Sequence, residues 1–565
     1  MLVEQSTASK TGGEAVVAGL LQHGIDVVFC LPGAQIYGLF DAFHQAQPRL
    51  RTIGARHEQA CGHMAFGYAR STGRAAVYAV APGEGMLNSS AALATAYGCN
   101  APVLLLTGEA PTGFLGKGRG QLHELPDQLA TLRSLTKWAA RIEHPTEAPW
   151  LVARAFQEML SGRRRPVALE MPWDIFTAKA PVRAADTLPL QPEPEPDSER
   201  VRGAARLLRE SRAPMIMVGG GAQDAGAEVL ELAELIEAPV VSFRSGRGVV
   251  SDAHELGLTV ASGYRLWPQT DVLIGIGTRL EVPNWRWPYQ PKGLKVIRID
   301  IDPAEMRRYT PDAGIVAGAA AGVRALIEAA RKLGVAGSGR RDAIRSAKAE
   351  ADREIRETLP QMAWLDVMRQ VLPGDGFFVD ELSQVGFTSS YGFPVYRPRT
   401  FISTGYSGTL GYGFQAALGV KIAHPDKPVL SVAGDGGFLF GVQELATAVQ
   451  NRIGVVCVVF NNHAFGNVLR DQQTLFDGHI LGATLVNPDF LKLADAFGVR
   501  GARARSPDEL RPIMEAAFAD GGPWLIEVPV EPGSEASPWR YIHPKPHSGA
   551  PVEAKSRALA SLDSH

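Results

Sequence analysis

The sequence has few cysteines, no long apolar run and almost no net charge, and each shortage excludes a class of protein. The four cysteines lie far apart with no CxxC pair, which argues against a disulfide framework or a cysteine metal site. No run approaches the roughly 20 apolar residues of a membrane-spanning helix, and the N-terminus lacks the apolar centre of a signal peptide. A formal net charge of −2 gives no electrostatic reason to expect nucleic acid or a membrane surface as partner. We therefore expect a cytoplasmic enzyme with reduced core thiols.

The sequence does contain three blocks in which strand and helix patterns alternate. Its 565 residues suggest about three or four domains, and 45% hydrophobic with 21% charged residues is an ordinary globular composition. Alternating strands and helices favour an α/β fold with doubly wound parallel sheets. The proline-rich stretch 183–196 and a polar stretch from Gly334 separate the blocks as linkers. The predicted domains are residues 1–182, 197–335 and 360–532, followed by a tail at 533–565 that is either a capping arm or disordered.

The most informative stretch joins two apolar runs through a glycine turn and a helix. Residues 429–433 and 455–460 have the pattern of buried strands; Gly-Asp-Gly-Gly (434–437) follows the first and Asn-Asn (461–462) the second. Residues 443–449 between them have helical spacing, so the unit is a right-handed strand–helix–strand crossover if the sheet is parallel. Both loops then leave the carboxyl ends of neighbouring strands, where open α/β sheets bind ligands.

This unit carries suitable ligands for a divalent metal and a diphosphate. The Asp435 carboxylate and the Asn462 amide oxygen are hard donors suited to Mg²⁺ or Ca²⁺, with phosphate oxygens completing the shell. Gly436 and Gly437 let backbone N–H groups approach a diphosphate at a helix N-terminus. A Gly-Asp-Gly alone is a common turn. Followed by 24 residues and then Asn-Asn, it resembles the cofactor signature of thiamine diphosphate (ThDP) enzymes.

A second stretch, RHEQACGHMAFGYARSTGR at residues 56–74, resembles the first domain of acetolactate synthases and benzaldehyde lyases. Glu58 stands there at the end of a strand and the start of an apolar helix. On its own it could be an acid favoured by the helix dipole. The resemblance implies instead a hydrogen bond to the aminopyrimidine ring of ThDP. A carboxyl in an apolar pocket can share a proton with the ring and favour the imino tautomer, which takes the C2 proton.

The resemblance extends from about Thr11 to Val530 and assigns further cofactor residues. It implies that Mg²⁺ is bound by Asp435, Asn462 and the carbonyl of Ala464. It also implies that Leu410, which alone would be an ordinary core leucine, lies beneath the cofactor and keeps it bent. The cofactor-binding residues so implied are Glu58, Asn88, Ser383, Gln384, Leu410, Gly434, Asp435, Gly436, Gly437, Asn462 and Ala464.

The substrate-side residues give a mixed pattern. Pro-Gly at 32–33 resembles acetolactate synthases, whereas LTKW at 135–138 and MPWDIF at 171–176 resemble the lyases. His123 or Glu124 falls where many relatives place a catalytic glutamine, with Gln121 close by. His123 could move protons near neutral pH or be a solvated loop histidine. The catalytic candidates are Glu58, Leu410, His123 and Glu124, and the substrate candidates are Pro32, Gly33, Ala34, Gln35 and Gln472.

Two features bear on cofactors and assembly. Gly219-Gly220-Gly221 follows a strand in the central block, which in relatives holds FAD, an ADP-like nucleotide or nothing. Residues 277–284 lack the acidic pair of the FAD-binding synthases, so FAD or ADP stays an open alternative. Because Glu58 and Asp435 belong to different domains, the resemblance implies a site between subunits. It therefore implies a homodimer at least, with a homotetramer as its extension; a single-subunit site is the alternative.

These observations predict a ThDP- and Mg²⁺-dependent decarboxylase-carboligase, similar to acetolactate synthase, for a small 2-oxo acid or an aldehyde. The reaction would pass through a C2 carbanion and an enamine, which is then protonated or joined to a second carbonyl. Gln472, where the biosynthetic synthases carry tryptophan, counts against a housekeeping acetolactate synthase. One alternative is an acyl-CoA lyase or decarboxylase of the oxalyl-CoA type, faintly resembled by ELPDQ at 124–128. Another is a catalytically silent ThDP-binding subunit, against which the intact Glu58, Asp435 and Asn462 count.

Overall fold

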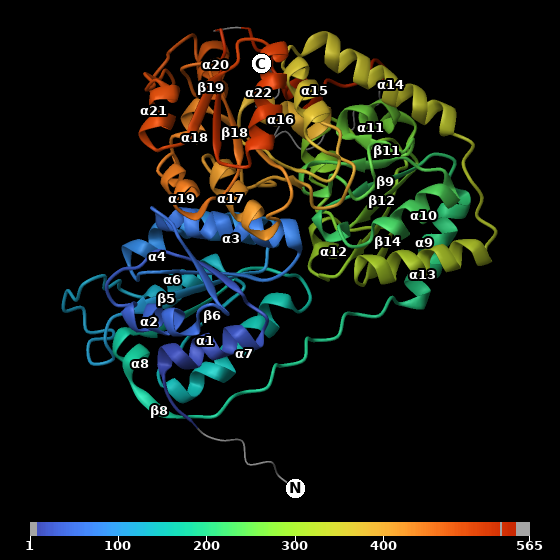
Figure 1. Cartoon of the computed structure of the whole chain (residues 1–565). Helices are drawn as coiled ribbons and strands as arrows, with labels where there is room; N and C mark the ends of the chain where they lie inside the picture. The colour runs from blue at the N-terminus through green and yellow to red at the C-terminus, as the bar shows by residue number, and fades with distance from the viewer. Residues whose placement is uncertain (1–7, 532–533, 550–565) are drawn as a thin grey trace.

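Three six-stranded sheets form the molecule (Figure 1). The structure, a computed structural model, describes residues 8–531 and 534–549. Every strand pair within these three sheets is parallel, and helices cover their faces. The prediction of three doubly wound parallel α/β sheets is confirmed.

The first sheet has the order β3-β2-β4-β5-β7-β6. Its strands are β2 (Val27–Cys30), β3 (Arg51–Gly54), β4 (Ala76–Val80), β5 (Val103–Glu109), β6 (Trp138–Arg141) and β7 (Val167–Pro172). The inner strands are buried along their whole length because both faces are covered, as continuous apolar runs predict. The helices are α1 (Gly12–Gln22), α2 (Tyr37–Ala46), α3 (Glu58–Thr72), α4 (Glu84–Asn88), α5 (Ser90–Gly98), α6 (Gln128–Leu135), α7 (Ala148–Leu160) and α8 (Trp173–Thr177). A separate antiparallel pair joins β1 (Ala8–Thr11) to β8 (Lys179–Val182).

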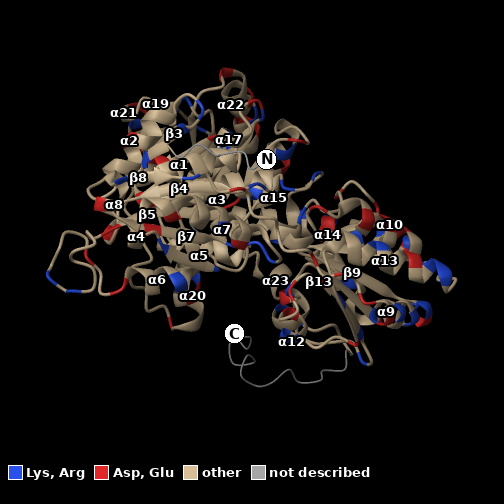
Figure 2. Cartoon of the chain, turned by 90° about the horizontal axis from the view of Figure 1, so that it is seen from below, with Lys and Arg blue, Asp and Glu red and all other residues tan. Residues whose placement is uncertain are grey.

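The central sheet has the order β11-β10-β9-β12-β13-β14. Its strands are β9 (Pro214–Val218), β10 (Val240–Ser242), β11 (Gly257–Thr259), β12 (Val272–Ile276), β13 (Lys295–Asp300) and β14 (Ala313–Val316). Its helices are α9 (Ser198–Glu210), α10 (Gly226–Ile236), α11 (Val260–Leu266), α12 (Glu305–Arg308) and α13 (Ala319–Lys332). Figure 2 shows acidic and basic residues side by side on α9, α10 and α13. Pairs such as Arg324–Glu228 at 2.7 Å join α13 to α10, but exposed ion pairs contribute little stability.

The third sheet, with the order β16-β15-β17-β18-β20-β19, contains the predicted crossover. β17 (Val429–Gly434) and β18 (Val456–Asn461) are adjacent and parallel, and α19 (Glu444–Asn451) connects them. The other strands are β15 (Phe377–Val379), β16 (Phe401–Ile402), β19 (Arg500–Arg503) and β20 (Trp524–Pro529). The other helices are α15 (Gln361–Val371), α16 (Gln384–Gly392), α17 (Gly413–Ala423), α18 (Asp435–Phe438), α20 (Gly466–Leu475), α21 (Phe490–Ala496), α22 (Pro507–Asp520) and α23 (Trp539–Ile542).

Helices α3 and α17 join the first domain to the third, and they touch backbone to backbone (Figure 1). A Cβ on Gly67 would lie 2.0 Å from the carbonyl oxygen of Ala416, and one on Gly419 would lie 1.9 Å from that of Met64. No other residue type fits at either position without separating the helices. The two small residues, one on each helix, therefore set how closely the two domains approach.

Two segments connect the three sheets along the chain. Residues 183–197 contain no helix or strand, and α14 (Arg341–Thr358) leads from the central domain to the third. We retain the boundaries 1–182, 197–335 and 360–532 as a proposal. Of the predicted tail, residues 534–549 are described, whereas 533 and 550–565 lie outside the described residues. Within the described ranges, no helix is both long and apolar enough to cross a membrane.

Candidate active site

Glu58 is the first residue of α3 and lies at the carboxyl end of the first sheet. The preceding His57 caps the helix, with its side chain accepting from the backbone N–H of Gln59. Glu58 accepts a hydrogen bond from the Asn88 side chain at 3.1 Å. A Cβ on Gly85 would lie 3.5 Å from Glu58 Oε1. The structure thus brings the predicted pyrimidine-binding residues Glu58 and Asn88 together.

His123 belongs to a loop that packs against Gly83, two residues before Gly85, which borders the Glu58 carboxylate. Its φ of +64° is a left-handed conformation, and a Cβ on Gly83 would lie 2.5 Å from its carbonyl oxygen. Its Nδ1 is buried and has no hydrogen-bond partner among the described residues. Glu124, by contrast, accepts from the backbone N–H groups of Gly118 and Gln121, each at 3.0 Å, and so holds its own loop together. This contrast favours His123 over Glu124 as the group available to a ligand.

The loop Pro32–Gln35 follows β2 and reaches the same end of the sheet. A Cβ on Gly33 would lie 2.8 Å from that of Ala81, and one on Gly108 would lie 2.4 Å from the Gln35 carbonyl oxygen. Gln35 is left-handed, with φ +67°, and its buried Oε1 has no hydrogen-bond partner within the part of the chain described. Four substrate candidates, Pro32, Gly33, Ala34 and Gln35, are therefore in one loop beside the loop after β4. Gln472 is elsewhere, on α20, where its amide bonds both backbone groups of Leu481 at 3.0 Å.

The candidate metal ligands form a second group, on the third domain. Asp435 begins α18, is 1% exposed, and accepts from Asn487 at 2.6 Å; burial raises the pKa of its carboxyl. Asn462 Oδ1 accepts from the backbone N–H of Ala464 at 3.1 Å, and its Nδ2 donates to Glu535 at 3.0 Å. No group of three His, Cys, Asp or Glu side chains in the described ranges could hold a metal. Carboxylate, amide and carbonyl oxygens joined by phosphate oxygens nevertheless fit Mg²⁺.

The glycines and polar residues predicted for the diphosphate lie around this group. A Cβ on Gly436 would lie 2.5 Å from the Phe465 ring, so only glycine fits there. A Cβ on Gly434 would lie 3.4 Å from that of Ser383, whose hydroxyl caps α16. Gln384 donates to Asn467 at 2.8 Å, while its buried Oε1 has no protein partner in the residues described. This cradle of small residues and available polar atoms fits a diphosphate.

The loop that carries Leu410 is fixed by an acid that the sequence interpretation missed. A Cβ on Gly437 would lie 3.2 Å from both Leu410 Cδ1 and the Glu381 carboxyl carbon. Glu381 is 2% exposed and accepts from the backbone N–H groups of Gly411 at 2.8 Å and Gly413 at 3.2 Å. Burial raises the pKa of Glu381 to about 7. An acid two positions after the end of the apolar strand β15 was the available signal.

Replacing Glu381 by Ala is expected to destabilise the protein by about 2–5 kcal/mol, because two buried N–H groups lose their acceptors. The pH dependence should also change. The folded-state pKa of this carboxyl is raised, so its contribution to the stability of the wild type falls as the pH rises from about 4.5 to about 7. The Glu381→Ala variant should lack this pH dependence. Chemical denaturation across this range measures both effects. Asp375→Ala, which removes a partly exposed ion pair with Lys427, should change stability far less; equal losses would contradict the assigned anchoring.

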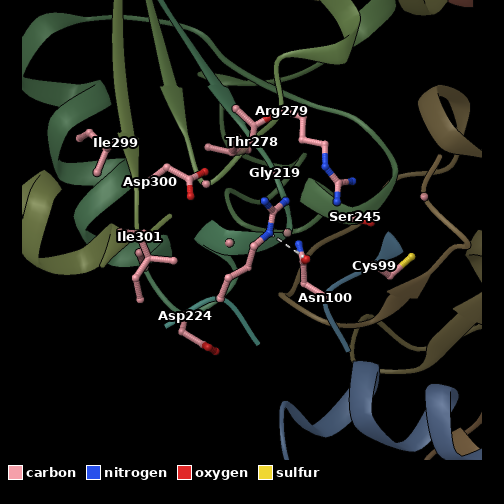
Figure 3. A pocket seen from close by; sticks show the side chains of 18 of the residues that line it. Cys99, Asn100, Gly219, Asp224, Ser245, Thr278, Arg279, Ile299, Asp300 and Ile301 are labelled. Atoms are coloured by element: carbon pink, nitrogen blue, oxygen red, sulfur yellow. Dashed lines mark hydrogen bonds between the residues drawn. The ribbon is translucent and has the colours of Figure 1, made fainter. Parts of the chain in front are cut away.

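A separate cavity of about 430 Å³ lies at the carboxyl end of the central sheet. Figure 3 shows Thr278, Arg279 and Asp300 around this space, with Asn100 and Asp224 across it. The glycine turn 219–221 lines it. Burial raises the pKa of Asp300, which accepts from the backbone N–H of Asp302. The cavity also reaches Gly405 and Tyr406, at the start of the loop that carries Leu410.

Comparison with known proteins identifies the three domains. The family models described as the N-terminal TPP binding, central and C-terminal TPP binding domains of thiamine pyrophosphate enzymes match residues 10–131, 201–326 and 383–528. Thiamine pyrophosphate is another name for ThDP.

Curated relatives match over almost the whole chain. A "Probable 2-ketoarginine decarboxylase" of Pseudomonas aeruginosa is 34% identical over 540 residues, covering 94% of this chain and 95% of that protein. A "Probable acetolactate synthase large subunit" of Methanocaldococcus jannaschii is 33% identical over 556 residues, covering 93% of each. The isozyme 1 large subunit of acetolactate synthase from Escherichia coli is 28% identical over 552 residues, covering 94% and 95%. With all three domains matched in order, the chain belongs to the thiamine pyrophosphate enzyme family.

Proposed function

We propose that the protein is a ThDP- and Mg²⁺-dependent decarboxylase-carboligase acting on a small 2-oxo acid or an aldehyde. The observation that carries the proposal is the pair of oxygen donors, Asp435 and Asn462, at the ends of the adjacent strands β17 and β18. In the glycine turn beside them, a Cβ on Gly436 would lie 2.5 Å from the Phe465 ring, so this position has no room for a side chain. The relatives named as a decarboxylase and as acetolactate synthases support a 2-oxo acid as substrate.

Each candidate residue then has a defined task. Asp435, Asn462 and the Ala464 carbonyl would hold Mg²⁺, and Ser383, Gln384 and the glycine turn would hold the diphosphate. Leu410 would support the cofactor from below, on a loop anchored by Glu381. Glu58 would exchange a proton with the aminopyrimidine ring, and His123 would move protons on the substrate side. When bound, ThDP supplies the acidic carbon and the electron sink that decarboxylation needs.

The proposal includes a homodimer at least, and by extension a homotetramer, with each site shared between subunits. The two groups of candidate residues belong to different domains, and each is held together by contacts of its own. Large apolar side chains are exposed beside both groups, and extended apolar surface marks association sites. They are Leu87 next to Asn88, and Leu475, Phe476, Ile480, Leu481 and Val486 on and after α20.

A panel of 2-oxo acids, aldehydes and acyl-CoA thioesters tests the reaction. The purified protein is supplied with ThDP and Mg²⁺, and released CO₂ and ligated products are both recorded. We expect CO₂ from at least one 2-oxo acid, and the panel includes 2-ketoarginine, which the name of one relative prints. CO₂ only from a thioester would favour the oxalyl-CoA type, and no turnover of any compound would contradict an enzymatic role.

We also propose that the central cavity binds an adenine nucleotide, as FAD or as ADP. It lies at the carboxyl ends of parallel strands beside a glycine turn, where such sheets bind nucleotides, and arginines such as Arg244 and Arg279 line it. Bound flavin would be visible in the absorbance of the purified protein. Without flavin, ADP at 100 times its Kd should raise the free energy of unfolding by about 2.7 kcal/mol. Absence of both signals would contradict the proposal.

A further inference from the structure

The segment Ser534–His547 runs from the candidate metal site to the central domain. Near its start, the backbone carbonyls of Ala536 and Pro538 accept from Gln361 at 2.5 Å and from Tyr391 at 3.0 Å. Near its end, the carbonyl of Lys545 accepts from Tyr264 at 2.8 Å. A segment held at both ends by side chains of two domains can present its own side chains in fixed positions.

Glu535, in this segment, lies against the candidate metal ligands. Its Oε2 accepts a hydrogen bond from Asn462 Nδ2 at 3.0 Å. The described part of the C-terminal segment thus adds a second carboxylate to the site that Asp435 and Asn462 form.

The chemistry of this contact fixes the direction of the Asn462 amide. A carboxylate only accepts hydrogen bonds, so the amide must present its NH₂ group to Glu535. Its oxygen is then turned away from Glu535 and keeps a lone pair besides the one that accepts from Ala464. An asparagine held in this way is ready to offer oxygen, not nitrogen, to a cation.

The same segment reaches the diphosphate side of the site through a second chain of contacts. Trp539 Nε1 donates to Asn467 Oδ1 at 3.3 Å, and the same oxygen accepts from Gln384 Nε2 at 2.8 Å. A Cβ on Gly466 would lie 2.9 Å from the Asn462 amide nitrogen and 3.7 Å from that of Gln384. Both amides therefore border Gly466, and both are held, directly or through Asn467, by the C-terminal segment.

We propose that Glu535 is a positioning residue that orients Asn462 and raises the affinity of the site for Mg²⁺. The inference rests on the proposed function, in which Mg²⁺ would be bound there together with ThDP. Groups that orient metal ligands typically change metal affinity by about 10–100-fold when removed. The negative charge of Glu535 acts in the same direction, since it lies close to where the cation would sit.

Magnesium titrations of three variants test this inference. The unfolding temperature is followed against MgCl₂ at a fixed ThDP concentration, because a ligand that binds only the folded protein raises it. In Glu535→Ala we expect half-saturation at about 10–100-fold more Mg²⁺ than in the wild type. Glu535→Gln keeps an acceptor oxygen for Asn462 and should shift by less. Glu531→Ala, which removes an exposed acid four residues earlier, should match the wild type.

The outcomes separate this inference from the proposed function. Equal titrations of Glu535→Ala and the wild type would overturn it, as would an equal shift in Glu531→Ala. Unfolding temperatures without ThDP and Mg²⁺ show whether each variant is folded, and the isosteric Glu535→Gln serves if Glu535→Ala is not. If the wild type itself showed no Mg²⁺-dependent response to ThDP, the proposed function would fail first, and the role of Glu535 with it.

Discussion

Replacing Glu58 by Gln is expected to lower kcat by about 10²–10⁴-fold, the usual contribution of a positioned acid–base group. Gln has nearly the same shape and still has an oxygen that can accept from Asn88, so the local structure should persist. It could not share a proton with the aminopyrimidine ring, so the proposed activation of the cofactor would be lost. Turnover of the best 2-oxo acid of the panel measures the effect, with ThDP saturating.

The matched control for Glu58 is Glu143→Gln, which changes an exposed acid of the same domain. It should leave both kcat and the unfolding temperature at wild-type values. If Glu58→Gln turned over substrate as fast as this control, the proton exchange assigned to Glu58 would be wrong.

Replacing Asp435 by Asn should weaken Mg²⁺-dependent ThDP binding by at least about a hundredfold, because even groups that only orient a ligand contribute about 10–100-fold. Asp435 is 1% exposed at the start of α18, so its charge faces the site with little screening by water. Asparagine has nearly the same size as aspartate and can still form hydrogen bonds, so the substitution removes the charge alone. The unfolding temperature against ThDP and Mg²⁺ concentrations measures the loss; Asp426→Asn, an exposed acid of the same domain, should titrate like the wild type.

Combining the two variants tests the shared site. In a twofold dimer co-expressed from Glu58→Gln and Asp435→Asn chains in equal amounts, half of the dimers are mixed and one of their two sites has both native residues. About a quarter of all sites should then be active. If the co-expressed chains were no more active than the two variants expressed separately, Glu58 and Asp435 of one chain would belong to the same site instead.

The fold was predictable where the pattern is local. A short apolar run that ends in a glycine turn, such as residues 429–433, favours a strand buried on both faces, and the structure has β17 there. The sequence pattern after the strand at residues 75–80 predicts a helix from Asn88, whereas in the structure α4 ends at Asn88 and α5 begins at Ser90. The Ser89 hydroxyl, which contacts Met86 and Tyr78, lies at this break. Hydrophobic spacing carries no sign of such a break.

The site was predictable where a motif joins neighbouring strands, and not where distant loops meet. Asp435 and Asn462 follow adjacent parallel strands, so their proximity follows from the crossover itself. Asn487 is 52 residues from Asp435, and Glu535 is 73 residues from Asn462. These partners come from segments without periodicity, and nothing local marks them as belonging to the site.

The contact between α3 and α17 has a consequence for how the cofactor enters. Gly67 and Gly419 bring backbone against backbone, which leaves no compressible layer of side chains over which the two domains could slide. If the first and third domains of one chain moved apart, this contact between α3 and α17 would have to break. In the proposed dimer, cofactor loading would then require two subunits to associate or a loop to close, because the first and third domains of one chain are held together.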